Sequence, residues 1–325
     1  MKKSLLALAV LGAFAGAASA QTNVTIYGIV DAAIERFDTN TTSATWSLTD
    51  GNSSFNKNGS RLGFRGTEDL GGGLSAIFTL ENGFNVDTGA MRADGIFSRQ
   101  AFVGLQGGFG AVKFGRQYTP MFLALDAIDP FGTGMAGAIN RLFNANGVRS
   151  SNTVNYSMAA AGLTGQLAYS FGEVAGDNSA SRQIGLGLGY ANGPINVQFA
   201  YHDANNATNT GDTQTALIGG SYNLGVAKIH AGFQTDKTET GAVTNVKDRN
   251  WMLGASAPVG AGEVRASFIR SDDRLANADT DQYALGYVHN LSKRTNVYTS
   301  YARQNDKSAT NADNNVFNVG LQHRF

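Results

Sequence analysis

Apolar and polar residues alternate position by position along most of the chain, in short runs that end at glycine- or asparagine-rich turns. Residues 74–81, 183–190 and 195–202 are typical, because in each run one set of alternate positions is almost wholly apolar. Successive side chains of a β-strand point to opposite faces, so a period of two predicts strands. We expect sixteen of them, beginning with 23–37 and ending with 314–325.

The connections between the expected strands alternate between short turns and long loops. The long connections are 38–57, 86–95, 119–147, 204–212 and 237–247. An even number of strands joined in this way forms an antiparallel meander with two unlike ends. Both chain termini then lie at the short-turn end, as in barrels that have short turns on one side of a membrane and long loops on the other.

Almost every expected strand has the same half-apolar pattern, and the pattern predicts no helix that could cover an apolar face. Sixteen strands closed on themselves also leave an interior too wide for side chains to fill. The economical arrangement directs the apolar set toward lipid and the polar set toward water inside, and closure removes every sheet edge. The sequence therefore predicts an all-β fold, a 16-stranded antiparallel transmembrane β-barrel.

The first residues of the chain do not follow this pattern. Two lysines precede an apolar stretch at 5–17, and the small residues at 18–20 suit a cleavage site. We therefore expect a signal peptide at 1–20 and a barrel at 21–325. An exported chain whose last strand runs to a terminal Phe325 is most simply a barrel of the cell outer membrane of a Gram-negative bacterium.

Charge and cysteine content narrow the function further. The chain has 25 basic and 25 acidic side chains, and loss of the two leader lysines would leave 23 against 25, a net charge of −2. Such a balance excludes a strongly basic nucleic-acid binder. The chain has no cysteine, so disulfides and thiolate metal or redox sites are excluded as well.

Three arginines, Arg61, Arg99 and Arg149, stand on strands that are otherwise small or apolar. Leu62 and Phe64 belong to the apolar set of their strand, so Arg61 belongs to the set that faces the lumen. A guanidinium on the lipid side at mid-depth would cost about 2–4 kcal/mol. The three arginines are therefore either a cluster inside the pore or separately solvated charges in the lumen and at its rim.

The connection 119–147 has the composition of a packed segment. Its large apolar residues are Met121, Phe122, Leu123, Leu125, Ile128, Phe131, Met135, Ile139, Leu142 and Phe143. A loop folded into the barrel could pack them on the wall, whereas an external loop would need a hydrophobic cluster of its own. An infolded loop would also place Asp126 and Asp129 opposite the wall arginines, which creates a transverse field across a narrow passage.

Four segments together resemble a known family. They are Tyr27-Gly28, the run RLGFRGTEDLGGGL at 61–74, the run GRQY at 115–118 and the terminal Phe325. In order and spacing they are similar to the general trimeric porins of Gram-negative bacteria, and most to the β-proteobacterial and neisserial branch. The resemblance covers the whole chain after residue 20. It implies a homotrimer of sixteen-stranded barrels, each with its third loop folded into the pore.

The resemblance also implies positions for the pore constriction. The matching positions are Arg61, Arg99 and Arg149 for the family's basic cluster, with Glu81 and Asp129 for its acidic side. The chain departs from some relatives at Thr133, where they carry a second loop acid, and at Ile29, where they carry a lysine. We therefore expect the constriction to consist of Arg61, Arg99, Arg149, Glu81, Asp126 and Asp129.

The expected function is passive diffusion of small hydrophilic solutes and ions. A weak preference for anions is expected because at least three wall arginines face two loop carboxylates and one wall carboxylate. We expect no enzymatic activity, no cofactor, no metal site and no nucleic-acid partner. The expected partners are further copies of the chain in a homotrimer, outer-membrane lipid and lipopolysaccharide, and the barrel-insertion machinery, which would read Phe325.

Two other functions stay open at the level of sequence. An outer-membrane barrel enzyme of the lipase or protease type needs a nucleophile, a base and an orienting group within reach. Its best candidate base, His202, is followed by Asp203, but adjacent strand residues point to opposite faces. A substrate-specific channel or an adhesin-like surface barrel would share the same fold.

Overall fold

The computed structural model describes residues 23–49, 55–92, 95–276, 278–308 and 312–325, and the expected signal peptide at 1–20 lies outside these ranges. The elements in chain order are β1 (Asn23–Thr39), β2 (Thr45–Thr49), β3 (Arg61–Gly71), β4 (Leu74–Gly83), β5 (Gln100–Gly107), β6 (Gly110–Tyr118), α2 (Pro120–Ile128), the 3-10 helix η1 (Ile139–Arg141), β7 (Arg149–Ala160), β8 (Leu163–Ser170), β9 (Gln183–Asn192), β10 (Ile195–Asn205), β11 (Asp212–Asn223), β12 (Lys228–Thr240), β13 (Val243–Val259), β14 (Gly262–Asp273), β15 (Thr280–Asn290), β16 (Thr295–Asp306) and β17 (Asn314–Arg324). Within the described ranges, helix occurs only between β6 and β7.

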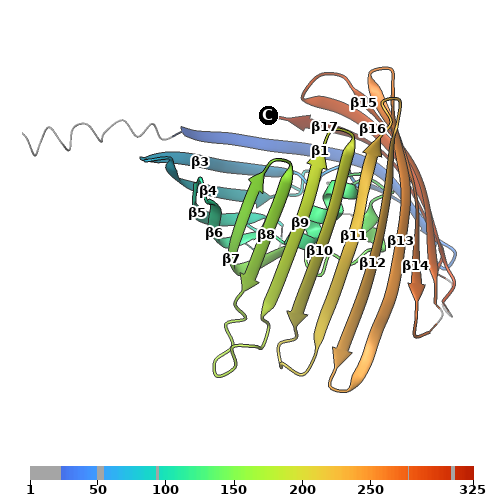
Figure 1. Ribbon diagram of the computed structural model, residues 1–325. Helices are drawn as coiled ribbons and strands as arrows, with labels where there is room; N and C mark the ends of the chain where they lie inside the picture. Colours follow the sequence, from blue (N-terminus) through green and yellow to red (C-terminus); the bar gives the residue numbers. More distant parts are fainter. Residues whose placement is uncertain (1–22, 50–54, 93–94, 277, 309–311) are drawn as a thin grey trace, which may run out of the picture.

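A single antiparallel sheet closes on itself (Figure 1). Strand β1 pairs along one edge with β17. Along its other edge, β1 pairs first with β3, over residues 23–29, and then with β2, over residues 33–37. The short strand β2 thus belongs to the first loop, and the other sixteen strands form the wall. This confirms the predicted 16-stranded antiparallel β-barrel.

The predicted long connection at 237–247 is wrong. Strand β12 runs on to Thr240 and β13 begins at Val243, so a tight turn joins two long strands. Gly241 takes a positive φ of 61°, a conformation that tight hairpin turns demand and that glycine adopts without strain. The polar residues of this segment continue the antiparallel ladder, as in the pair Lys237↔Lys247. Their polarity reflects solvent around the hairpin, which explains why polar composition alone does not distinguish these strand ends from a loop.

The two faces of the barrel wall differ in polarity, as the period of two predicts. On β17, Phe317, Val319 and Leu321 point outward and are exposed, whereas Asn318 and Gln322 are buried inside. Other large apolar side chains exposed on the outer wall are Val197, Ile218, Trp251, Leu253 and Leu285. An apolar outer wall around a polar interior is the arrangement of a barrel surrounded by lipid.

No helix in the described part of the chain is both long and apolar enough to cross a membrane.

The connection between β6 and β7, residues 119–148, folds into the barrel and confirms the predicted infolded third loop. Its helix α2 begins at the N-cap Thr119, whose hydroxyl accepts a hydrogen bond from the Phe122 N–H at 3.2 Å. Pro120 takes the first helical position, where its missing N–H costs nothing. The buried residues Met121, Leu125 and Ile128 repeat with helical spacing and form one face.

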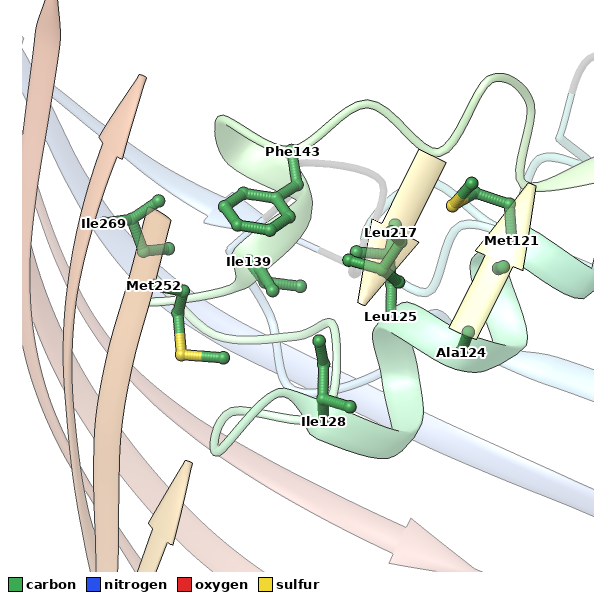
Figure 2. Close-up of a cluster of buried hydrophobic side chains, with 10 residues drawn as sticks. Met121, Ala124, Leu125, Ile128, Ile139, Phe143, Leu217, Met252 and Ile269 are labelled. Atoms are coloured by element: carbon green, nitrogen blue, oxygen red, sulfur yellow. The ribbon is translucent and has the colours of Figure 1, made fainter. Parts of the chain in front are cut away.

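Figure 2 shows what this helical face packs against. Leu217 on β11, Met252 on β13 and Ile269 on β14 point into the barrel and meet the loop, together with Ile139 and Phe143 from its returning half. Leu217, Met252 and Ile269 are therefore apolar residues on the inner face of the wall, where most other side chains are polar. The third loop therefore supplies the hydrophobic core that the wall of so wide a barrel cannot form alone.

Hydrogen bonds fix the path of the third loop across the lumen. The Ala136 N–H donates to Ser300 Oγ at 3.0 Å, and the Asn144 N–H donates to Gln234 Oε1 at 2.7 Å. The Met135 N–H donates to the Asn56 carbonyl oxygen of the first loop, residues 40–60, at 2.8 Å. The third loop is thus held by wall strands and by the first loop, and its side chains have defined positions in the passage.

Candidate pore constriction

A cavity of about 430 Å³ lies between the third loop, the end of the first loop and the wall formed by β3, β6 and β7. The charged residues that line it are Lys57, Arg61, Arg92, Arg99, Arg149 and Asp126. The structure thus brings together four of the six expected constriction residues, the three arginines and Asp126. Among the described residues of this cavity, five basic side chains surround one carboxylate.

Glu81 does not line the cavity and stands behind Arg99. Its Oε1 accepts a hydrogen bond from Arg99 Nε at 2.7 Å, and the Tyr27 hydroxyl donates to its Oε2 at 3.0 Å. The Glu81 residue is only 3% exposed. A buried and paired carboxylate of this kind orients the guanidinium and offsets part of its charge.

Tyr118, at the end of β6, joins two of the guanidinium groups. Its hydroxyl oxygen accepts hydrogen bonds from Arg99 Nη2 at 2.8 Å and from Arg149 Nη2 at 2.9 Å. The central carbon of the Arg149 guanidinium also lies 4.4 Å from the centroid of the Tyr118 ring. A shared acceptor and an aromatic face thus hold two like charges side by side.

Gly59 and Gly83 leave room for Arg92, and Gly59 also accepts a hydrogen bond from Arg61. Arg61 Nε donates a hydrogen bond to the Gly59 carbonyl oxygen at 3.0 Å. A Cβ on Gly59 would lie 2.8 Å from Arg92 Nη2, and a Cβ on Gly83 would lie 3.0 Å from Arg92 Cδ. A side chain at either glycine would therefore displace Arg92.

Lys57 comes from the first loop and reaches the wall at β16. Its ammonium group donates a hydrogen bond to Asn296 Oδ1 at 3.0 Å. Burial, together with the nearby guanidinium groups of Arg265 and Arg324, lowers the pKa of Lys57 to about 8. Lys57 can therefore lose its charge in a pH range in which arginines stay charged.

The two loop carboxylates point in different directions. Asp126 lines the cavity, and its Oδ1 accepts a hydrogen bond from the Thr133 hydroxyl at 2.6 Å. Asp129 is 6% exposed, and its carboxylate accepts hydrogen bonds from the backbone N–H groups of Phe131, Thr133 and Ile139. Burial raises the pKa of Asp129 to about 6, although these three donors favour the charged form. Asp129 thus fastens the turn of the third loop and does not line the cavity.

Lys57 and Arg92 are absent from the expected constriction. Both lie in long connections, which the pattern alone places outside the barrel. Lys57 precedes Arg61 by only four residues, and this proximity was a usable signal, because a loop entering that strand must bring the two charges near each other. Arg92 has no such signal. Its segment returns to the wall through the bridge Phe84↔Met91, and the sequence pattern does not predict this bridge.

The cavity is suited to anions and not to metal ions. Its polar donors are guanidinium, ammonium and hydroxyl groups, which bind oxyanions. No group of three or more histidine, aspartate or glutamate side chains in the described ranges has the arrangement of a metal site. His202 is buried, and Pro120 of α2 packs against the wall beside its ring, at Gly185.

A closed barrel with an apolar outer wall, whose charged passage is narrowed by its own third loop, is a membrane pore. The family described as Gram-negative porin matches residues 7–320 of the chain. The protein therefore belongs to the Gram-negative porins. It lies in the outer membrane, where porins act as channels and let small hydrophilic solutes and ions diffuse across.

Curated relatives and a solved structure agree with this assignment. An outer membrane porin protein of Bordetella pertussis is 36% identical over 386 residues, which cover 100% of both chains. Outer membrane porin protein 32 of Delftia acidovorans is 37% identical over 95% of this chain and 91% of its own length. A solved structure described as an anion-selective porin from Comamonas acidovorans has a TM-score of 0.83 and 32% identity, covering 94% of this chain and 100% of that one.

The different settings of the two loop carboxylates predict different effects of neutralising them. Asp126→Asn should move the reversal potential in a salt gradient toward anion selectivity, because it removes the carboxylate that lines the cavity. Asp129→Asn should shift the reversal potential less. It should increase open-channel current noise instead, because an amide cannot accept from all three backbone N–H groups, and each unsatisfied group costs about 1–3 kcal/mol.

Planar-bilayer recordings of both variants beside the wild type would measure these effects. A larger change in reversal potential for Asp129→Asn than for Asp126→Asn would mean that the Asp129 carboxylate faces the passage after all.

Proposed function

We propose that this porin prefers small anions weakly and selects solutes by charge and size. The selection takes place at the cavity between the first loop, the third loop and the arginine wall, which consists of Arg61, Arg99 and Arg149. The observation that carries the preference is the excess of basic side chains around Asp126. In a narrow water-filled passage such an excess raises the local concentration of anions and lowers that of cations. The anion selectivity named for the related Comamonas acidovorans porin supports the proposal.

Two features keep the proposed preference weak. Glu81 offsets the charge of Arg99 through the ion pair at 2.7 Å. Asp126, opposite the arginines, stays in the passage and attracts cations. The field between Asp126 and the arginines orders water and ions in the passage. The excess of positive charge then decides which sign of ion passes more easily.

The enzyme alternative has little support in this arrangement. An accessible base is required for hydrolysis, and His202 lies 2% exposed beneath the third loop. We therefore propose that the protein converts no substrate chemically. The second alternative, a channel with a preferred solute, makes a different prediction, namely that one class of solute blocks the ion current at a concentration where others do not.

The decisive test of the anion preference is removal of two arginines that line the cavity. Arg61→Ala combined with Arg149→Ala should move the reversal potential toward cations and raise single-channel conductance, because positive charge is lost and the passage widens. In the wild type, raising salt from 0.1 M to 1 M should reduce the anion preference, because the Debye length falls from about 10 Å to about 3 Å. Planar-bilayer measurements in potassium chloride gradients report both quantities.

A matched control removes two positive charges far from the cavity. Lys293→Ala combined with Arg294→Ala changes exposed residues of the short turn between β15 and β16. This control should keep the wild-type conductance and reversal potential at 1 M salt. Wild-type selectivity in the Arg61 and Arg149 double variant would refute the proposed constriction.

The proposed contribution of Lys57 gives the selectivity a pH dependence. The pKa of Lys57 is lowered to about 8, so its ammonium group loses a proton as pH rises from 7 to 9. The anion preference of the wild type should therefore fall over this range, while the arginines stay charged. The variant Lys57→Met should start from a lower preference and show no such fall. A reversal potential of the wild type that is constant between pH 7 and 9 would exclude a role for this amine.

We further propose that the protein assembles as a homotrimer, that lipid and lipopolysaccharide cover the rest of its apolar outer wall, and that insertion machinery reads the terminal Phe325. Phe325 lies beside β1, where its N–H and carbonyl group pair with Gly28 at 3.1 Å. Unboiled protein should run on a denaturing gel as a heat-labile trimer. A monomer by light scattering in mild detergent would contradict the trimer.

Deletion of Phe325 should lower the amount of the protein in the outer membrane. An undiminished amount would contradict the terminal signal.

A further inference from the structure

An aromatic surface borders the cavity next to the arginines. The rings of Tyr118 and Phe122 stack with centroids 5.2 Å apart and planes 12° apart, and the Arg149 guanidinium packs against the Tyr118 ring. Phe122 and its neighbour Leu123 are partly exposed and line the cavity, as does Val148. The cavity therefore has an apolar side in direct continuity with its cationic side. We call Phe122 and Leu123 the apolar shelf.

The geometry of α2 explains why this shelf faces the passage. Met121 and Leu125 belong to the face that packs on the barrel wall in Figure 2. At about 100° per residue, Phe122, Leu123 and Asp126 lie on the side of the helix opposite the buried Met121, Ala124, Leu125 and Ile128, so they face away from the wall. Phe122 is thus not needed for the hydrophobic core that anchors the loop, and its exposed surface is available to a solute.

The hydrogen bonds of Tyr118 leave one donor unused. A phenolic hydroxyl offers two acceptor lone pairs and one proton, and the two guanidinium groups of Arg99 and Arg149 occupy the lone pairs. No described residue accepts a hydrogen bond from the Tyr118 hydroxyl. Among the described residues, the Gly59 carbonyl oxygen accepts a hydrogen bond from Arg61 Nε, and none accepts from the two terminal nitrogens of Arg61. The Tyr118 hydroxyl and the terminal nitrogens of Arg61 therefore have no acceptor among the described residues, and an oxyanion in the cavity can accept from them.

We propose that this cavity binds aromatic carboxylates in preference to other small anions. The carboxylate would accept hydrogen bonds from Arg61, Arg149 and the Tyr118 hydroxyl, and the ring of the solute would pack on the shelf formed by Phe122 and Leu123. A volume of about 430 Å³ lies within the range of about 300–1,000 Å³ that small-molecule sites span. This inference rests on the proposed anion preference and adds the class of anion that the pore retains longest.

The proposal separates three classes of anion by what each can contact. Inorganic anions and acetate can engage only the cationic side, so they gain nothing from the shelf. An aromatic ring that carries no charge can contact the shelf but leaves the unused donors without an acceptor. Only a molecule with both parts satisfies both sides, and charge-assisted hydrogen bonds to the carboxylate fix its orientation on the ring stack.

The test compares how strongly benzoate and acetate block chloride current through the native full-length porin. The readout is the ratio of the two half-blocking concentrations in 0.1 M potassium chloride at pH 7. Benzoate should block the wild type at a concentration roughly 2- to 12-fold lower than acetate, the size expected for one aromatic contact. Phe122→Leu should lower the ratio clearly, because the side chain stays apolar but loses the ring on which the solute stacks.

A matched control replaces a phenylalanine on the strand that carries Tyr118. Phe114 lies on the outer face of β6 and is 49% exposed, so Phe114→Leu should keep the wild-type ratio. A ratio of one in the wild type would overturn the proposal without any variant, as would an unchanged ratio in Phe122→Leu. If Phe122→Leu fails to assemble, Leu123→Ala tests the same shelf and should also lower the ratio.

The same recordings distinguish this inference from the proposed function. Reversal potentials in potassium chloride report the general preference for anions, which depends on the arginines. A wild type that favours chloride over potassium but blocks equally with benzoate and acetate would leave the anion preference standing and remove the aromatic site. A wild type that favours potassium would remove the anion preference itself.

Discussion

Packing of the third loop on the inner wall is the interaction on which the whole constriction depends. Sixteen strands enclose more space than their own side chains can fill. The buried stripe of α2 meets Leu217, Met252 and Ile269 in the lumen and converts part of that space into a hydrophobic core. Burial of one face of the helix fixes the direction of the other, and that other face presents Phe122 and Asp126 to the arginine wall. One face of α2 therefore packs on the wall, and the opposite face supplies side chains to the passage.

The first loop contacts the third loop across the passage and helps to hold it in place. Strand β1 pairs with β3 up to Ile29 and with β2 from Ala33 onward. The end of the first loop enters the lumen at this change of partner. There the Asn58 N–H donates to Asp31 Oδ2 at 2.8 Å, and the Asn56 carbonyl receives the Met135 N–H of the third loop. The two loops thus brace each other across the passage. The contacts between the two loops bring Lys57 to the cavity, which is why it lines the cavity although it lies on no barrel strand.

The sequence predicts well what depends on periodicity and poorly what depends on how a loop turns. The alternation of apolar residues predicts the sixteen strands, and the apolar content of 119–147 predicts a packed loop, because burial of apolar surface is the main stabilising term in both. The two carboxylates of that loop look equivalent in sequence. Asp129 turns back because the backbone N–H groups of Phe131, Thr133 and Ile139, which follow α2 in the loop, need an acceptor, and Asp126, about one turn earlier, accepts from none of these. The position of Arg92 likewise depends on how its loop turns, through the bridge Phe84↔Met91, which the alternation of apolar residues does not predict.

The placement of charge matters more in this pore than its total. The chain carries 25 basic and 25 acidic side chains, so no net field favours either sign of ion. At the cavity the balance is different, because Asp129 is withdrawn into the third loop and Glu81 is paired behind Arg99. What remains is a group of cations around Asp126, in which Tyr118 joins Arg99 and Arg149 and the Gly59 carbonyl oxygen holds Arg61. Like charges held this close repel one another, so the positions of these cations and of Asp126 set the field that a solute meets in the passage.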